Sequence, residues 1–139
     1  MMTMPVSVGD PIPGFSREVV QADINKYAEA SGDYNPIHIN EEFAKATPLG
    51  GTIAHGMLVL AYMSEMLARA FGDAWDSTGH FSARFRSPAC PGDKLEVAGN
   101  VESVSEEGDI VVVTCSLSCR NQADEVVVSG EARVGLRGR

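Results

Sequence analysis

The sequence has few cysteines and few basic residues, and its beginning lacks the features of an export signal. Its three cysteines form no Cys-x-x-Cys pair, which argues against a disulfide framework and a zinc site. Lysine and arginine number 11 against 19 acidic residues, a net charge of -8, so the basic surface that general nucleic-acid binders need is missing. The N-terminal residues carry neither a basic nor an apolar signal region. We therefore expect a reduced, cytoplasmic protein that does not bind nucleic acid.

The first half of the chain reads as helical, and its composition is that of a packed domain. With 139 residues, 44% of them hydrophobic, we expect one domain over residues 1–139. Apolar residues recur at helical spacing over 22–31, a short helix is expected over 41–46, and 53–71 is the most apolar segment. This last segment is short for a membrane span and contains Glu65 and Arg69 as an i,i+4 pair. A helix that is apolar nearly all round belongs inside a protein.

The second half is rich in valine, serine and threonine, in segments separated by turn residues. Antiparallel strands are predicted over 81–86, 94–104, 109–121 and 125–134, with a further short strand over 15–20. Cys115 and Cys119 fall on one side of their strand and are expected to be buried thiols. Helices followed by strands indicate an α+β fold, a curved antiparallel sheet wrapped around the buried helix.

Polar residues at two places in this apolar setting are candidates for chemistry. Asp33, Asn35 and His38 are expected in a tight loop, because Gly32 is suited to end the first helix and Pro36 disfavours helix at the preceding residue. His55 and Gly56 lie near the start of the buried helix, and Ser64 lies inside it. An aspartate and a histidine five positions apart are by themselves a weak signal.

Longer motifs around these residues make the signal specific. The string Gly32-Asp33-Tyr34-Asn35-Pro36-Ile37-His38 resembles the signature of the MaoC-like, (R)-specific enoyl-CoA hydratase family, and Ala54-His55-Gly56-Met57 resembles its second motif. The resemblance extends over about residues 8–134. It implies a hot-dog fold and a homodimer with active sites near the subunit interface. It also implies acyl thioesters of CoA or acyl-carrier protein (ACP) as substrates, without a metal or another cofactor.

The resemblance assigns roles that fit the chemistry of water addition to an enoyl thioester. A carboxylate and an imidazole about one water apart can take a proton from water and deliver one to the α-carbon. Asp33 is implied as the base and His38 as the proton donor, although either group can move either proton. The enolate oxygen needs a donor, and the N–H of Gly56 at a helix start is implied for it. Ser64 is implied to orient Asp33, and Asn35 is expected to shape the loop.

Some of these polar residues also have purely structural interpretations. The Ser64 hydroxyl can instead bond the carbonyl four residues back, and we interpret His55 as a capping or packing residue. Arg84, Arg86 and Lys94 are interpreted as exposed strand charges.

The leading functional hypothesis is an (R)-specific enoyl-CoA hydratase. Its nearest rival is an (R)-3-hydroxyacyl-ACP dehydratase of chain elongation, which would use the same residues. A non-catalytic acyl-CoA-binding hot-dog subunit and a hot-dog thioesterase rank lower, because such a subunit would be expected to lose the Asp/His pair and thioesterases as a rule lack this motif. Acyl chain length, carrier and physiological direction are left open by these patterns.

Overall fold

The computed structural model describes residue 2 and residues 4–138. Within these residues, five antiparallel strands form one sheet in the order β1-β3-β4-β5-β2. The strands are β1 (Pro11–Glu18), β2 (His80–Phe85), β3 (Lys94–Glu107), β4 (Ile110–Arg120) and β5 (Val126–Arg137). The helices are α1 (Gln21–Ser31), α2 (Pro36–Ile39), α3 (Glu41–Lys45), α4 (Gly56–Phe71) and α5 (Asp73–Thr78).

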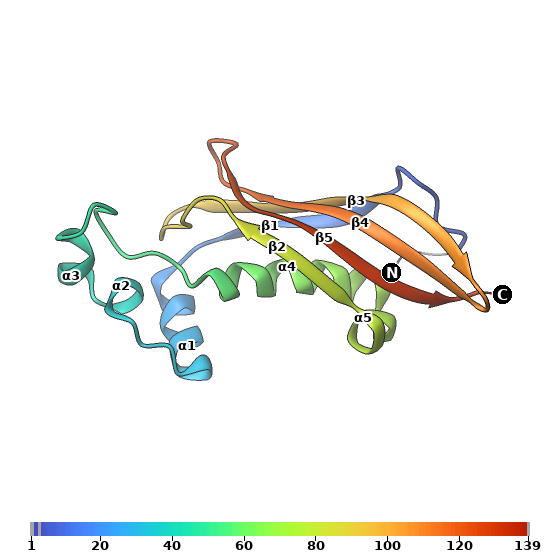
Figure 1. Cartoon of the computed structure of the whole chain (residues 1–139). Coiled ribbons are helices and arrows are strands. Elements are labelled where there is room, and N and C mark those ends of the chain that lie inside the picture. Colours follow the sequence, from blue (N-terminus) through green and yellow to red (C-terminus); the bar gives the residue numbers. More distant parts are fainter. Residues whose placement is uncertain (1, 3, 139) are drawn as a thin grey trace.

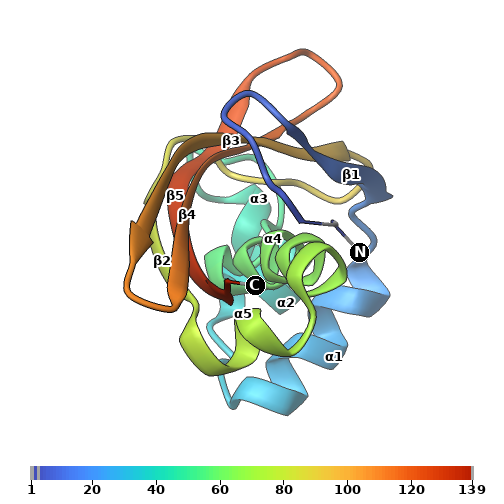
Figure 2. The same cartoon turned by 90° about the vertical axis from the view of Figure 1, so that its right-hand side faces the viewer.

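The sheet curves around α4, which runs along its concave face (Figures 1 and 2). Met63, Met66 and Leu67 of this helix are fully buried and fill the space under the sheet. In β4 buried and more exposed residues alternate, and Cys115 and Cys119 both point into the core, as expected. These features confirm the α+β architecture of a curved antiparallel sheet around a buried helix. Within the described residues no helix combines the length and apolar character needed to cross a membrane.

The segment with the candidate loop lies near one end of the sheet, where α1 lies below the sheet and α2 and α3 lie beyond its end (Figure 1). Helix α1 ends at Gly32, which adopts φ 77° and donates its N–H to the carbonyl of Ala28, so the expected helix stop is confirmed. The expected loop around His38 is corrected in part, because Pro36–Ile39 forms one short helix. Asn35 caps this helix by accepting the N–H of Ile37, and proline is well suited to its first position.

Element boundaries differ from the sequence prediction at several places. Strand β1 begins at Pro11, not at residue 15, because an edge strand tolerates proline and a bulge falls between Ile12 and Phe15. Helix α4 begins at residue 56, not 53, because the preceding segment is held elsewhere: the N–H of Ile53 donates to the carbonyl of Ile37 in α2, and that of Ala54 to the carbonyl of Ala89. Helix α5, which follows Gly72 directly, was not predicted. The expected pairing of Glu65 with Arg69 is present.

Candidate active site

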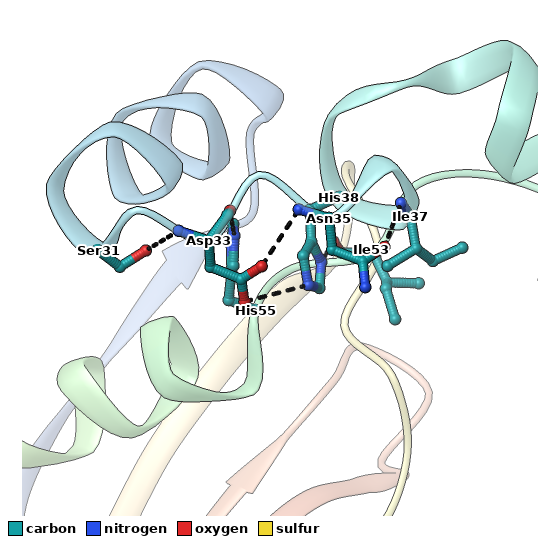
Figure 3. Close-up of polar contacts among 7 residues, drawn as sticks. All are labelled: Ser31, Asp33, Asn35, Ile37, His38, Ile53 and His55. Atoms are coloured by element: carbon teal, nitrogen blue, oxygen red, sulfur yellow. Dashed lines mark hydrogen bonds and ion pairs between the residues drawn. The ribbon is translucent and has the colours of Figure 1, made fainter.

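His38 in α2 and Asp33 in the loop between α1 and α2 face each other (Figure 3). The Nδ1 atom of His38 lies 2.8 Å from the carbonyl oxygen of Ile53. A carbonyl oxygen only accepts, so Nδ1 carries a proton and Nε2 is the ring nitrogen left for chemistry. That Nε2 atom lies 3.9 Å from Oδ2 of Asp33. The imidazole is 12% exposed and the carboxylate 52%, so the pair opens to solvent on the aspartate side.

The separation of the two groups suits a water molecule held between them. At 3.9 Å the Nε2 and Oδ2 atoms are too far apart for a direct hydrogen bond. One water can bridge such a gap by donating to both when the imidazole is neutral. Asp33 and His38 can then act on the same water oxygen, which is the arrangement that general acid–base catalysis of hydration requires.

Short-range hydrogen bonds set the direction of the Asp33 carboxylate. Its Oδ1 atom accepts the N–H of Asn35 at 3.2 Å, which leaves Oδ2 toward His38. The Asp33 N–H donates to the Ser31 hydroxyl at 3.1 Å. The side-chain oxygen of Asn35 accepts a hydrogen bond from the N–H of Ile37 at 3.1 Å. This geometry makes Asn35 a loop-shaping residue, and its side-chain oxygen is already engaged.

Two residues that the sequence interpretation did not single out hold this segment against the rest of the chain. The amide of Gln21, at the start of α1, donates to the carbonyl of His38 at 2.8 Å. The buried hydroxyl of Thr52 donates to the side-chain Oε1 atom of Gln21 at 2.7 Å and so fixes that amide. These contacts join residues far apart in the sequence, so no local pattern indicates them.

His55 lies directly behind the pair. It is the residue before α4, is 2% exposed, and its Nε2 atom lies 3.0 Å from the carbonyl oxygen of Asp33. Its ring stacks on that of His38 with centroids 3.8 Å apart and an interplanar angle of 27°. Tyr27 packs on it at 4.8 Å, in a tilted orientation. The predicted packing role is therefore consistent with the structure, and the contact to Asp33 is an addition to it.

The start of α4 opens into a cavity that also contains His38. This cavity has a volume of about 370 Å³ and is lined by His38, Gly56, Val59, Phe85, Arg86 and Val128, among others. Leu58 and Val59 donate their N–H groups to the carbonyl of His55. The N–H groups of Gly56 and Met57 have no acceptor among the described residues. A helix N-terminus with free N–H groups is suited to bind developing negative charge.

Gly56 leaves room for an aromatic ring. A Cβ atom on Gly56 would lie 2.7 Å from Cε1 of Phe85, a side chain that is 56% exposed. The absence of a side chain therefore lets the Phe85 ring approach the helix start closely. Phe85 also lines a second, apolar groove of about 510 Å³, together with Met57, Leu60, Ser64 and Trp75 among others.

Ser64 lies apart from the Asp33 carboxylate in the single chain. Its hydroxyl oxygen accepts the indole N–H of Trp75 at 2.9 Å, and none of the hydrogen bonds among residues 4–138 joins it to Asp33. The implied role of orienting Asp33 therefore stays a prediction. Of the three basic residues interpreted as surface charges, Arg86 lines the cavity, whereas Lys94 lies at a different surface depression.

The donor atoms of Asp33, His38 and His55 lie within 4.8 Å of one another, close enough to raise the question of a metal ion. Each imidazole has one nitrogen at hydrogen-bond distance from a backbone carbonyl, which leaves one nitrogen on each ring as a possible ligand. Stacked rings, however, hold their in-plane lone pairs side by side, whereas the ligands of a metal must converge on one point. The arrangement fits an acid–base pair backed by a second ring better than a metal centre.

Comparison with known proteins identifies the family of the chain. The family model described as MaoC like domain matches residues 5–122. The chain is 35% identical to a 3-hydroxybutyryl-CoA dehydratase from Methylorubrum extorquens, over 85% of this chain and 73% of the relative. It is 30% identical to an (R)-specific enoyl-CoA hydratase from Rhodospirillum rubrum, over 89% of this chain and 84% of the relative. A mitochondrial 3-hydroxyacyl-[acyl-carrier-protein] dehydratase from Arabidopsis thaliana is 34% identical, over 91% of this chain and 75% of the relative.

Solved structures show the same fold. The (R)-hydratase from A. caviae involved in PHA biosynthesis superposes with a TM-score of 0.84 at 26% identity, covering 95% of this chain and 98% of the other. The R-hydratase PhaJ1 from Pseudomonas aeruginosa gives 0.83 at 28% identity, covering 96% and 84%. The fold is thus the hot-dog fold, and the chain is similar to hydratases and dehydratases that have it. The chain belongs to the MaoC-like family and is a hydro-lyase.

Proposed function

We propose that this chain is an (R)-specific enoyl-CoA hydratase, which adds water reversibly to trans-2-enoyl thioesters to give (R)-3-hydroxyacyl thioesters. The observation that carries the proposal is the pair formed by Asp33 Oδ2 and His38 Nε2, 3.9 Å apart. His38 faces the same cavity as Gly56, whose N–H is free of partners in the described part of the chain. The proposed proton donor and oxyanion donor thus line one cavity, and the proposed base Asp33 faces that proton donor.

The proposed reaction follows from these positions. A water between Asp33 and His38 forms a bond from its oxygen to the β-carbon as one of its protons passes to the pair. The electrons of the double bond move toward the thioester carbonyl, and the resulting enolate oxygen is stabilised by the N–H of Gly56. A proton from the pair then adds to the α-carbon as the carbonyl re-forms. The reverse sequence removes water through the same atoms, because the equilibrium is a property of the substrates.

Turnover of a short enoyl thioester tests the proposal. Wild-type protein is expected to hydrate crotonyl-CoA, followed as loss of the absorbance of the conjugated double bond. Asp33→Asn is expected to fold and to lose about 10²- to 10⁴-fold in kcat, the usual contribution of a positioned acid or base. Asp109→Asn, in the exposed turn between β3 and β4, is the matched control and should leave kcat unchanged. If wild type is as inert as Asp33→Asn on thioesters of every chain length, the proposal is wrong.

The second candidate is dehydration of (R)-3-hydroxyacyl thioesters on acyl-carrier protein. It is supported by the similarity to the plant dehydratase named above, which is close in extent to that of the CoA enzymes. Paired assays with the same acyl group on CoA and on acyl-carrier protein separate the two. A large preference for the carrier-protein substrate in kcat/KM would favour the second candidate.

The proposal includes three further points. Residues 1–139 form a single domain, two copies of the chain form a homodimer, and the protein is located in the reducing environment of the cytoplasm. The three cysteines are free, which suits a reducing compartment. Strand β2 is an edge of the sheet, and the exposed apolar side chains of Met57 and Phe85 lie beside the adjoining groove. An edge strand next to an apolar surface is a typical site of pairing with a second copy. Light scattering coupled to size exclusion measures whether the mass is that of two chains.

A further inference from the structure

Within the described part of the chain, His55 and Thr52 are the two buried polar residues. The Nδ1 atom of His55 is shielded from solvent and has no hydrogen-bond partner among the described residues. Its side chain makes no capping bond to α4, although it occupies the N-cap position of that helix. Burying an unpartnered nitrogen costs stability, so neither core packing nor helix capping explains the presence of histidine.

The contacts that His55 does make go to both members of the proposed pair. Its ring lies face to face with the His38 ring at 3.8 Å and restricts rotation of that imidazole. Its Nε2–H donates to the backbone carbonyl of Asp33 at 3.0 Å, because a carbonyl oxygen can only accept. The carbonyl of Ile53 holds the far edge of the His38 ring through Nδ1. His38 is thereby held in its plane by one contact and against its face by another (Figure 3).

We propose that His55 is a positioning residue that sets the 3.9 Å separation between Asp33 and His38. It does so through one ring, which fixes the His38 plane by stacking and fixes the Asp33 backbone by its N–H. Tyr27 closes the other side of the ring at 4.8 Å and keeps it in place. The inference rests on the proposed function for its catalytic consequence. Its geometric part, the dependence of the His38 ring on His55, stands independently of any substrate.

Two substitutions separate the contacts of His55. His55→Phe keeps a flat ring against His38 and removes both the donor to Asp33 and the unpartnered nitrogen. His55→Gln removes the stacked ring and retains an N–H donor. His80→Gln, at the exposed start of β2, is the matched control for replacing a histidine. Each variant is examined for thermal stability, for kcat and KM on crotonyl-CoA, and for the ring nitrogen signals of His38 in ¹⁵N NMR.

A positioning role predicts that activity falls while thermal stability does not. His55→Phe is expected to melt at the wild-type temperature or above it, and to lose about 10- to 100-fold in kcat, because small misplacements of reacting groups have effects of that size. KM should change little, because binding of the thioester is untouched. His55→Gln should shift the His38 ring signals, whereas His80→Gln should change neither these signals nor kcat.

The opposite results overturn the inference. If His55→Phe and His55→Gln both keep wild-type kcat and wild-type His38 signals, His55 is a packing residue only. If His55→Phe does not fold, the same decision falls to His55→Gln. If wild type shows no turnover, the proposed function fails, and the His38 signals alone decide the positioning role. If wild type turns over and Asp33→Asn does not, while the His55 variants match wild type, the function stands and this inference fails.

Discussion

Arg17 in β1 and Glu65 in α4 form a bidentate ion pair, with Nη1–Oε1 and Nη2–Oε2 distances of 2.7 Å and 3.1 Å. Arg69, one turn further along α4, also pairs with Glu65. The Arg17 guanidinium lies over the rings of Phe15 and Tyr62, at 4.7 Å and 4.9 Å. This cluster ties an edge strand of the sheet to the central helix through charge and through stacking.

Loss of this ion pair should lower stability in a pH-dependent way. The hydrogen bond from Arg17 holds the pKa of Glu65 below its ordinary value. The contribution of this ion pair to the free energy of unfolding is therefore present above the unfolded-state pKa of about 4.3. It is lost as pH falls through the lower folded-state pKa of Glu65. Because a third of each side chain is exposed, we expect Glu65→Gln to cost about 1 kcal/mol at neutral pH. Urea unfolding at neutral and acidic pH measures both effects, and equal loss in the control Glu102→Gln would contradict the assignment.

Gly56→Ala should reduce activity much more than stability. The added methyl group would meet the Phe85 ring at 2.7 Å, and this half-exposed ring can move aside. The methyl group would still intrude on the cavity next to the free N–H, so we expect a loss of at least about tenfold in kcat/KM. Complete removal of an oxyanion donor costs about 10²- to 10³-fold in kcat. The double variant with Phe85→Ala gives the control. If that variant regains full activity, glycine is needed only for ring packing and the oxyanion role is wrong.

Asn35 should be replaceable by serine and not by alanine. Its side-chain oxygen accepts the N–H of Ile37 and begins the short helix that carries His38. Asn35→Ala removes this cap, a change that costs typically about 1 kcal/mol and here would loosen the loop locally. We expect kcat to fall in Asn35→Ala and to be largely retained in Asn35→Ser, which keeps a capping oxygen. Equal kinetics of the two variants would show that the cap does not set the His38 position.

The thiols should differ in reactivity and affect stability only at high pH. Burial raises the pKa of Cys115 to about 11 and that of Cys119 to about 12, and it also raises that of Cys90, which is only half-buried. At about pH 8 a thiol reagent should therefore label Cys90 slowly and the other two only after unfolding. Because the folded pKa values exceed the unfolded value of about 8.5, stability should decline as pH rises above that value. Rapid labelling of all three in native protein would contradict the buried geometry.

Much of the fold follows from local patterns. Gly32 predicts the end of α1 because the chain there takes a positive φ, which only glycine adopts easily. The spacing of Cys115 and Cys119 predicts their shared face because side chains in a strand alternate. The apolar segment predicts α4 as the core helix. Each of these features depends on a few residues in sequence, so the sequence contains the information directly.

Features that depend on distant partners could not be predicted in this way. Helix α4 begins late because Ile53 and Ala54 bond to carbonyls of Ile37 and Ala89, which only the folded chain brings near. Within the site, the motif indicates which residues belong together. It does not indicate the stacking of His55 on His38 or the engagement of Ser64 by Trp75, because both are contacts between separate elements.

The placement of α2 and α3 beyond the end of the sheet has a consequence for how the protein loses activity on warming (Figure 1). None of the side chains of α2 is buried, and α3 buries only Ala44, whereas Met63, Met66 and Leu67 of α4 are fully buried. Segments with so little apolar anchoring open at lower free energy than the core to which they are attached. Amide hydrogens around His38 should therefore exchange well ahead of those in α4. Inactivation by heat should therefore precede unfolding of the sheet. Residual activity would then report the local opening equilibrium of the α2–α3 segment and not the melting of the domain.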